Sequence, residues 1–215
     1  MQNKKKILRK KYSFFLFDLD GVIFDSKKNM EVSWNATAKN FGLKSGFKLY
    51  FKHIGIPFES ICRKLKIKKN IIKIKQFYSK QSIKNFNLIK VYPGVLNLLN
   101  KLNKNKIKFS IVTSKDYFRS KKLLKKFQIF PSSIHCPSPG VKGKPSPDLL
   151  LRCLKKNSIR NNISCYVGDT SHDYIASKKA KLDFIFAEYG YGRKEIKYKL
   201  KIKSFKELNS YINKM

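Results

Sequence analysis

The stretch Tyr12-Ser-Phe-Phe-Leu-Phe-Asp-Leu-Asp-Gly21 decides the fold. Residues 12–17 form a continuous apolar run of strand length, which is typical of a strand buried on both faces of a parallel sheet. Two carboxylates, Asp18 and Asp20, follow this run directly. They therefore lie at the carboxyl end of the predicted strand, the edge where open α/β sheets bind their ligands.

Three later segments, residues 107–112, 163–167 and 184–187, are apolar runs of the same kind. Amphipathic helical patterns separate them, such as the stripe formed by Val95, Leu98, Leu99 and Leu102. Strands that alternate with helices predict an α/β fold with a doubly wound, Rossmann-like parallel sheet.

Residues 25–91 break this alternation, because they contain helical patterns and no convincing strand. We expect a small helical insertion there, placed after the first strand, between core segments 1–24 and 92–215. Two further helix starts are predicted. Ser146 is the expected N-cap of a helix with Pro147 at its first position, and Ser204 with Glu207 is the expected capping box of the last helix.

Composition narrows the class of protein. A hydrophobic content of 42% excludes intrinsic disorder, and no apolar run reaches the ~20 residues needed to cross a bilayer. The four scattered cysteines form no zinc-binding pair. We expect a cytoplasmic protein. The net charge of +36 is spread over the whole length, which favours general attraction of anionic ligands over a dedicated nucleic-acid interface.

Asp18 and Asp20 are two residues apart, so in extended backbone they project to the same side. Neighbouring like charges are relieved by a hard divalent cation, above all Mg²⁺. The alternative is a solvated turn, which Gly21 permits.

Polar residues end the later strands as well. Asp169 follows the run at 163–167 and precedes Asp173 by four residues, while Thr113 and Ser114 follow the run at 107–112. Lys144 precedes Pro145 and Pro147 at a predicted helix entrance, where it can neutralise a phosphoryl group. Alone, the hydroxyls are commonly a helix cap, and one lysine among 49 basic residues carries little weight. Four of only thirteen acidic residues in two strand-end motifs nevertheless argue against a random scatter.

In this order the motifs resemble those of the haloacid dehalogenase superfamily, in particular its phosphoglycolate phosphatase-like branch. They are D-x-D-G-V-x-x-D-S at residues 18–26, T-S-K at 113–115, K-P-x-P-D at 144–148 and G-D-T-x-x-D at 168–173. The resemblance spans almost the whole chain, and the helical insertion matches the family's cap. One departure is Lys181 after Ala180, where the family usually has glycine.

The resemblance implies a Mg²⁺-dependent phosphatase for a small phosphorylated metabolite. Asp18 would be the nucleophile and Asp20 the general acid and base. The metal would bind the Asp18 carboxylate, the Asp20 backbone carbonyl and Asp169.

Phosphoryl oxygens would bind Thr113, Ser114 and Lys144. Gly21 and Asp173 would support the site, Asp173 by orienting Lys144 or a metal-bound water.

Two other functions remain open. One is a phosphomutase that transfers phosphate between sugar phosphates, which would share Asp18 and Asp20. The other is a non-catalytic binder of nucleic acid or of an anionic surface. Carbon–halogen hydrolysis is disfavoured, because the dehalogenases lack the second aspartate. The sequence indicates neither the substrate nor an oligomeric state.

Overall fold

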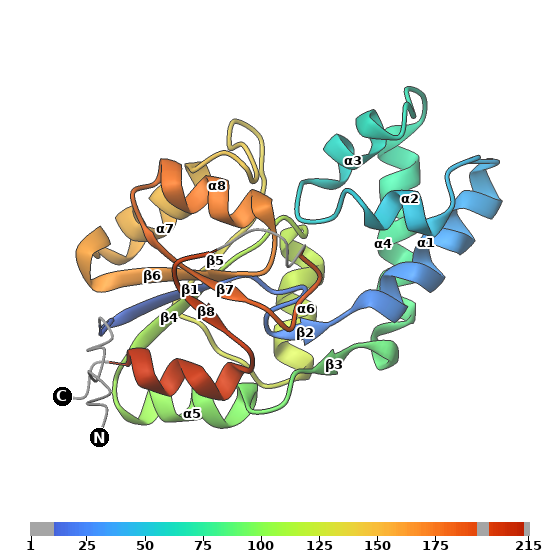
Figure 1. Cartoon of the computed structure of the whole chain (residues 1–215). Helices are drawn as coiled ribbons and strands as arrows, with labels where there is room; N and C mark the ends of the chain where they lie inside the picture. The colour runs from blue at the N-terminus through green and yellow to red at the C-terminus, as the bar shows by residue number, and fades with distance from the viewer. Residues whose placement is uncertain (1–10, 193–197, 213–215) are drawn as a thin grey trace, which may run out of the picture.

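The computed structural model describes residues 11–192 and 198–212, so the basic start of the chain lies outside the described residues. Its centre is a six-stranded sheet of parallel strands in the order β5-β4-β1-β6-β7-β8 (Figure 1). The strands are β1 (Phe14–Phe17), β4 (Lys108–Val112), β5 (Ile134–His135), β6 (Ser164–Gly168), β7 (Asp183–Ala187) and β8 (Lys201–Ile202). Because β4 and β6 flank β1, the segments that follow these three strands meet at one edge.

Helices cover both faces of the sheet. This cover is needed because the apolar side chains of β1 point alternately to the two faces. They are α5 (Val95–Lys104), α6 (Tyr117–Lys126), α7 (Asp148–Asn157), α8 (Ser171–Lys179) and the 3-10 helices η2 (Asn161–Ile163) and η3 (Phe205–Tyr211). Phe15 and Phe17 pack into one hydrophobic cluster with α5, α6 and η3. Phe14 and Leu16 pack into a second cluster with α7 and α8. The predicted doubly wound α/β fold is confirmed.

A helical segment lies beside the sheet, between β2 (Phe24–Asp25) and β3 (Lys90–Val91) (Figure 1). It contains α1 (Lys27–Phe41), α2 (Phe47–Phe51), α3 (Phe58–Lys64), α4 (Ile71–Lys84) and the 3-10 helix η1 (Phe86–Leu88). The buried apolar residues of α1 to α4 form a third hydrophobic cluster around Trp34, whereas Phe86 of η1 packs with the first cluster. The helical insertion after the first strand is therefore present.

Several local predictions were wrong. The two ends of the helical segment pair as antiparallel strands, β2 with β3, although no strand was expected near residues 25–91. The helix after Ser146 begins at Asp148, with Pro147 in the N-cap position and no side-chain cap. The last helix is of the 3-10 type, and Ser204 makes no side-chain cap bond. Strands of two residues and individual helix caps leave little signal in the sequence, and tertiary packing decides whether they form.

Lys181 adopts the left-handed conformation with φ of 54°. This backbone region favours glycine, and it is the position where the resembled family usually has one. The departure therefore places a strained lysine in the turn after α8. Within the described ranges, no helix is long and apolar enough to span a membrane.

Trp34 is the centre of the third cluster. It is fully buried, its ring stacks on Tyr50 at a centroid distance of 4.3 Å, and its Nε1 donates to the Ser45 carbonyl oxygen at 2.8 Å. We expect Trp34→Leu to lower the free energy of unfolding by about 3 kcal/mol, because it removes ring volume and a hydrogen bond. Urea unfolding followed by far-UV circular dichroism measures this. Ile72→Ala, at a 74% exposed site on α4, is the control and should cost less than about 0.5 kcal/mol. Equal losses would contradict the assigned role of Trp34.

Candidate active site

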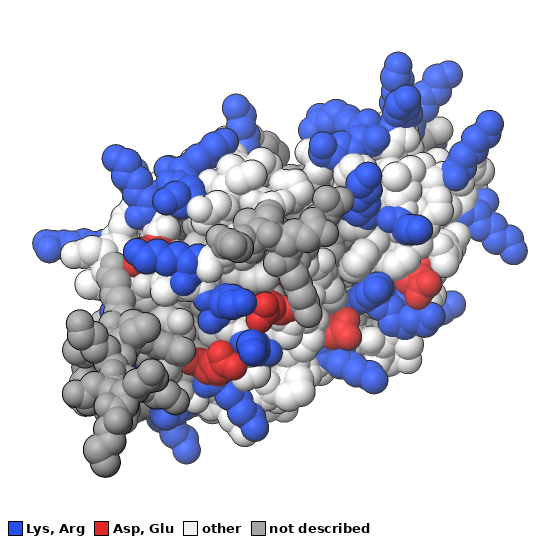
Figure 2. Space-filling view, in the orientation of Figure 1, with Lys and Arg blue, Asp and Glu red and all other residues white. Residues whose placement is uncertain are grey.

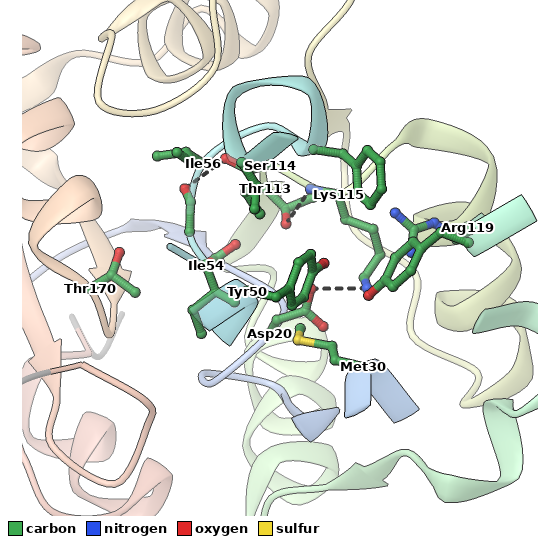
Figure 3. A pocket seen from close by; sticks show the side chains of 15 residues that line it. Asp20, Met30, Tyr50, Ile54, Ile56, Thr113, Ser114, Lys115, Arg119 and Thr170 are labelled. Carbon is green, nitrogen blue, oxygen red and sulfur yellow. Dashed lines mark hydrogen bonds and ion pairs between the residues drawn. The ribbon is translucent and has the colours of Figure 1, made fainter. Parts of the chain in front are cut away.

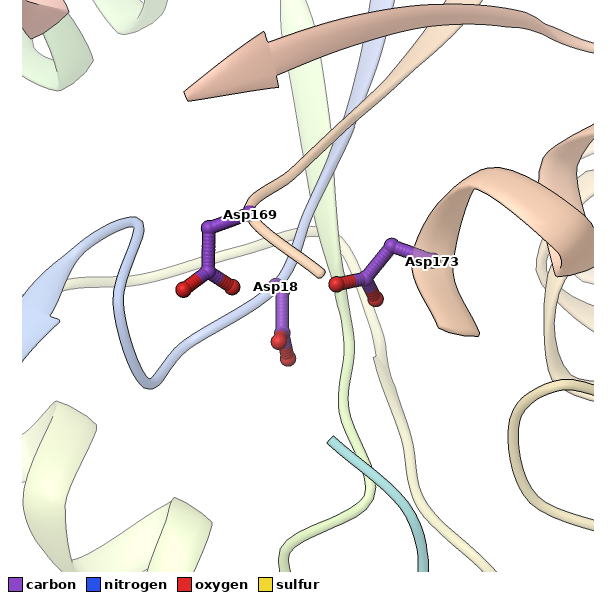
Figure 4. A group of neighbouring side chains, drawn as sticks. All are labelled: Asp18, Asp169 and Asp173. Atoms are coloured by element: carbon purple, nitrogen blue, oxygen red, sulfur yellow. The ribbon is translucent and has the colours of Figure 1, made fainter. Parts of the chain in front are cut away.

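Three carboxylates converge at the edge where β1 and β6 end. Asp18 follows β1, Asp169 follows β6, and Asp173 lies in the first turn of α8. Their side chains point toward one another (Figure 4), and one oxygen of each lies within 4.8 Å of the others. All three are at most 3% exposed, so their charges are little screened by water.

Lys144 is the cation buried among these carboxylates. Its Nζ lies 2.9 Å from Asp18 Oδ2 and 2.5 Å from Asp173 Oδ1, and it also donates to the Tyr166 hydroxyl at 3.0 Å. Burial lowers the pKa of Lys144, but the two carboxylates raise it more, and the net pKa is above its ordinary value. Lys144 is therefore charged, and it binds the two aspartates together.

Asp173 is fully occupied by the protein. Oδ1 accepts from Lys144 and Tyr166, while Oδ2 accepts from both the backbone N and the Oγ1 of Thr170. Thr170 and Asp173 form the capping box that starts α8. Burial raises the pKa of Asp173, but Lys144 and the hydrogen bonds lower it to below its ordinary value. With both oxygens engaged, Asp173 is suited to positioning Lys144 and has little capacity left for a cation.

Asp18 and Asp169 each keep one buried oxygen, Oδ1, that finds no hydrogen-bond partner among the residues the structure describes. Burial raises the pKa of Asp18 to about 6 and that of Asp169 well above its ordinary range. Asp169 Oδ2 accepts from the Tyr191 backbone N at 2.7 Å. Gly21 makes room for this carboxylate, because a Cβ there would lie 2.0 Å from Asp169 Oδ2. Two unpartnered carboxylate oxygens in close proximity are the kind of ligands that Mg²⁺ prefers.

Asp20 turns away from this cluster and toward a cavity. Its Oδ1 accepts from Ser26 Oγ at 2.5 Å, and its Oδ2 lies 3.0 Å from Lys115 Nζ. The side chain is therefore separate from the candidate metal ligands, as expected for a residue that offers a metal only its backbone carbonyl. When Asp18, Asp20, Asp169 and Asp173 are all ionised, Lys115 and Lys144 are the lysines paired with them in the described part of the chain. Two negative charges then remain, which one divalent cation would neutralise.

Thr113 and Ser114, which follow β4, take different directions. Thr113 is 2% exposed, lines the cavity, and accepts from the Lys115 backbone N at 3.3 Å. Ser114 Oγ instead donates to the Gly55 carbonyl oxygen at 2.8 Å, across to the helical segment. The structure thus brings Thr113 to the site through its side chain, whereas the Ser114 side chain contacts the segment above it.

The cavity beside Asp18 and Asp20 has a volume of about 50 Å³. Its walls come from both the sheet side and the helical segment (Figure 3). Lys115 and Arg119, at 7% and 5% exposure, line it. Lys115 belongs to the T-S-K motif but had no predicted role, and Arg119 was not named from the sequence. The sequence did contain an indication of Arg119, because it lies on the same buried stripe of α6 as Leu123. An apolar residue is expected at such a position.

Comparison with known proteins identifies the family of this chain. The family model of haloacid dehalogenase-like hydrolases matches residues 15–187. A phosphoglycolate phosphatase of Aquifex aeolicus is 29% identical over 181 residues, which are 82% of this chain and 84% of the relative. The pyrophosphatase PpaX of Oceanobacillus iheyensis is 25% identical over 169 residues, 78% of this chain and 79% of the relative.

The fold also matches solved structures. CbbY from Rhodobacter sphaeroides in complex with phosphate superimposes with a TM-score of 0.81 at 20% identity, covering 93% of this chain and 99% of that chain. Such a likeness establishes the fold, while the family match spans well over half of the sequence. The chain therefore belongs to the haloacid dehalogenase-like hydrolase family.

Proposed function

We propose that the protein is a Mg²⁺-dependent phosphatase that hydrolyses a small phosphomonoester, phosphoglycolate or a related phosphometabolite, through an aspartyl-phosphate on Asp18. The observation that carries this proposal is the pair of unpartnered buried oxygens on Asp18 and Asp169 beside the charged Lys144. The phosphatase and pyrophosphatase named among the relatives support the choice of phosphate chemistry.

In the first step, a carboxylate oxygen of Asp18 attacks phosphorus, and the bond from phosphorus to the leaving oxygen breaks. Lys144, Thr113 and the backbone of Ser114 hold the phosphoryl oxygens. Lys144 is suited to this task because Asp173 and Tyr166 fix its ammonium group. Positioning and charge neutralisation are the main requirements of phosphoryl transfer, and buried, mutually bonded side chains meet both.

Asp20 moves the protons. It donates one to the leaving oxygen, so that an alcohol departs, and it then removes one from the water that hydrolyses the aspartyl-phosphate. The products are the alcohol and inorganic phosphate. Ser26 and Lys115 orient the Asp20 carboxylate toward the cavity, which is the position a proton shuttle needs.

Asp18, Asp169 and the backbone carbonyl of Asp20 would hold the Mg²⁺ ion. Bound there, the ion supplies positive charge to the transferring phosphoryl group. The two unpartnered oxygens and the local excess of negative charge fit this cation, whereas Asp173 is engaged by Lys144, Tyr166 and Thr170.

Residues 25–91 would act as a cap that closes over the substrate, with the core in residues 1–24 and 92–215. The contact from Ser114 Oγ to the Gly55 carbonyl and the cavity walls contributed by the helical segment support this role. Closure of such a segment excludes water from the reaction. A cytoplasmic location suits a small-metabolite substrate.

A phosphomutase remains the second candidate, because it would use Asp18 and Asp20 in the same way. Transfer of phosphate to an added sugar phosphate instead of to water would identify it. Nucleic-acid binding is the third. Basic side chains are spread over the visible face of the molecule (Figure 2) and are not gathered on one element, which favours general electrostatic attraction over a dedicated interface.

Asp18→Asn is expected to lower phosphate release from phosphoglycolate at least ~10³-fold, because an amide is a poor nucleophile and holds a metal weakly. A malachite green assay with Mg²⁺, repeated with EDTA, measures this. Glu31→Gln, which removes one charge on the exposed face of α1, is the control and should retain the wild-type rate. Release at the native rate by the asparagine variant would rule out the aspartyl-phosphate.

Asp169→Asn is expected to stabilise the metal-free protein by about 1–3 kcal/mol at pH 8, because it removes a buried charge. Folding raises the pKa of Asp169, so the wild type loses stability as pH rises from the unfolded pKa to the folded one. The gain should therefore vanish below about pH 4, where Asp169 is protonated in both states.

Thermal unfolding in EDTA and in Mg²⁺ tests this prediction. Mg²⁺ should raise the melting temperature of the wild type and of Glu31→Gln, but not that of Asp169→Asn. An equal rise in all three proteins, or a metal-free wild type that is more stable than Asp169→Asn at pH 8, would contradict the assigned ligand.

A further inference from the structure

Arg119 lies at one side of the cavity, with Lys115, while Thr170 lies at the other (Figure 3). It belongs to the buried face of α6 together with Ser120, Leu123 and Leu124. Only 5% of its surface is exposed. A guanidinium group is costly to bury unless its donors are used, so its partners decide its role.

The described residues use one of the five N–H donors of this guanidinium group. The Arg119 Nε pairs with Asp116 Oδ2, and the guanidinium carbon lies 5.1 Å from the centroid of the Tyr78 ring. Among the described residues, no acceptor receives a hydrogen bond from the terminal Nη atoms of Arg119. Each of these atoms carries two N–H donors. Because Arg119 lines the cavity, a ligand there could accept hydrogen bonds from donors that the described residues leave unused.

The other groups at this side of the cavity do not compete for a ligand. Lys115 is already paired with Asp20, and the helical segment contributes the largely apolar side chains of Met30, Tyr50 and Tyr78. The guanidinium fork matches the two oxygens of a carboxylate or the oxygens of a phosphate. In apolar surroundings such a pairing is selective, because a neutral group would leave the fork unsatisfied.

We propose that the terminal nitrogens of Arg119 bind a second anionic group, carboxylate or phosphate, on the leaving side of the substrate. This inference rests on the phosphatase function proposed above and adds its specificity-determining residue. The small cavity restricts the spacer between the two anionic groups to a short one. Thr113 precedes α6 and Arg119 lies in its first turn, so the sites for the two anionic groups stand on one continuous stretch of the core.

Two matched pairs of substrates test the proposal. The first is phosphoglycolate and the phosphate ester of glycolamide, which replaces the carboxylate by a neutral amide of similar shape. The second is pyrophosphate and methyl phosphate, which tests phosphate as the second anion. For the wild type, we expect kcat/KM to favour the charged member of at least one pair by about 100-fold.

Arg119→Met and Arg119→Lys are the test variants, and Arg63→Met is the matched control. Arg63 is an exposed arginine of α3 that donates to Ser60 Oγ, so its loss changes the net charge equally without touching this cavity. Arg119→Lys keeps the positive charge and can still pair with Asp116. It is therefore expected to fold even if Arg119→Met does not. Both Arg119 variants should lower the preference to below about 5-fold, and Arg63→Met should retain it.

Acetyl phosphate, a small reactive phosphate without a second charged group, tests the phosphatase function alone. Absence of phosphate release from it would reject that function and the inference with it. Release from acetyl phosphate combined with no preference in either pair would overturn only the role of Arg119. Equal loss of activity on charged and neutral members in the Arg119 variants would also overturn that role, since a structural contact with Tyr78 predicts such a loss.

Discussion

The repulsion among three buried carboxylates constrains the whole site. They belong to Asp18, Asp169 and Asp173, and one oxygen of each lies within 4.8 Å of the others. Lys144 relieves part of this repulsion by pairing with Asp18 and Asp173 at once. Such an arrangement requires a rigid frame, because unpaired buried charges otherwise favour unfolding or protonation. Parallel strands provide it: β1 and β6 are hydrogen-bonded neighbours, so the aspartates that follow them are held side by side.

The hydrogen bonds made by the two oxygens of each carboxylate indicate different roles for the aspartates. Asp173 has both oxygens engaged, and its pKa is lowered by Lys144 and its hydrogen bonds despite burial. Asp169 has one engaged and one unpartnered oxygen, and burial raises its pKa. Opposite shifts in neighbouring carboxylates are a sign of distinct roles. The charge of Asp173 is satisfied by its protein partners, whereas the unpartnered oxygen of Asp169 would gain a partner if a cation bound there.

The sequence predicted the sheet and the meeting of Asp18, Thr113, Lys144 and Asp169, because apolar runs and their polar ends are local signals. It missed what depends on long-range packing. A capping box was expected from the sequence at Ser204 and Glu207, and none was identified at Thr170 and Asp173. The one at Thr170 and Asp173 forms, whereas Ser204 makes no cap. Composition alone does not separate them, since burial beside Lys144 is what fixes the Thr170–Asp173 pair. Arg119 was missed because its helix was read only for its apolar stripe.

Charge is distributed on two length scales. The chain has 49 basic and 13 acidic residues, yet Asp18, Asp20, Asp169 and Asp173 gather where β1 and β6 end. Beyond about 8 Å at physiological salt, surface charges are largely screened, so the basic exterior attracts anions to the molecule without choosing among them. Discrimination between anionic ligands therefore has to occur in the buried site, where water is excluded. The buried site places opposite signs at fixed positions, with carboxylate oxygens that suit a cation and lysine and arginine donors that suit the anionic groups of the proposed substrate.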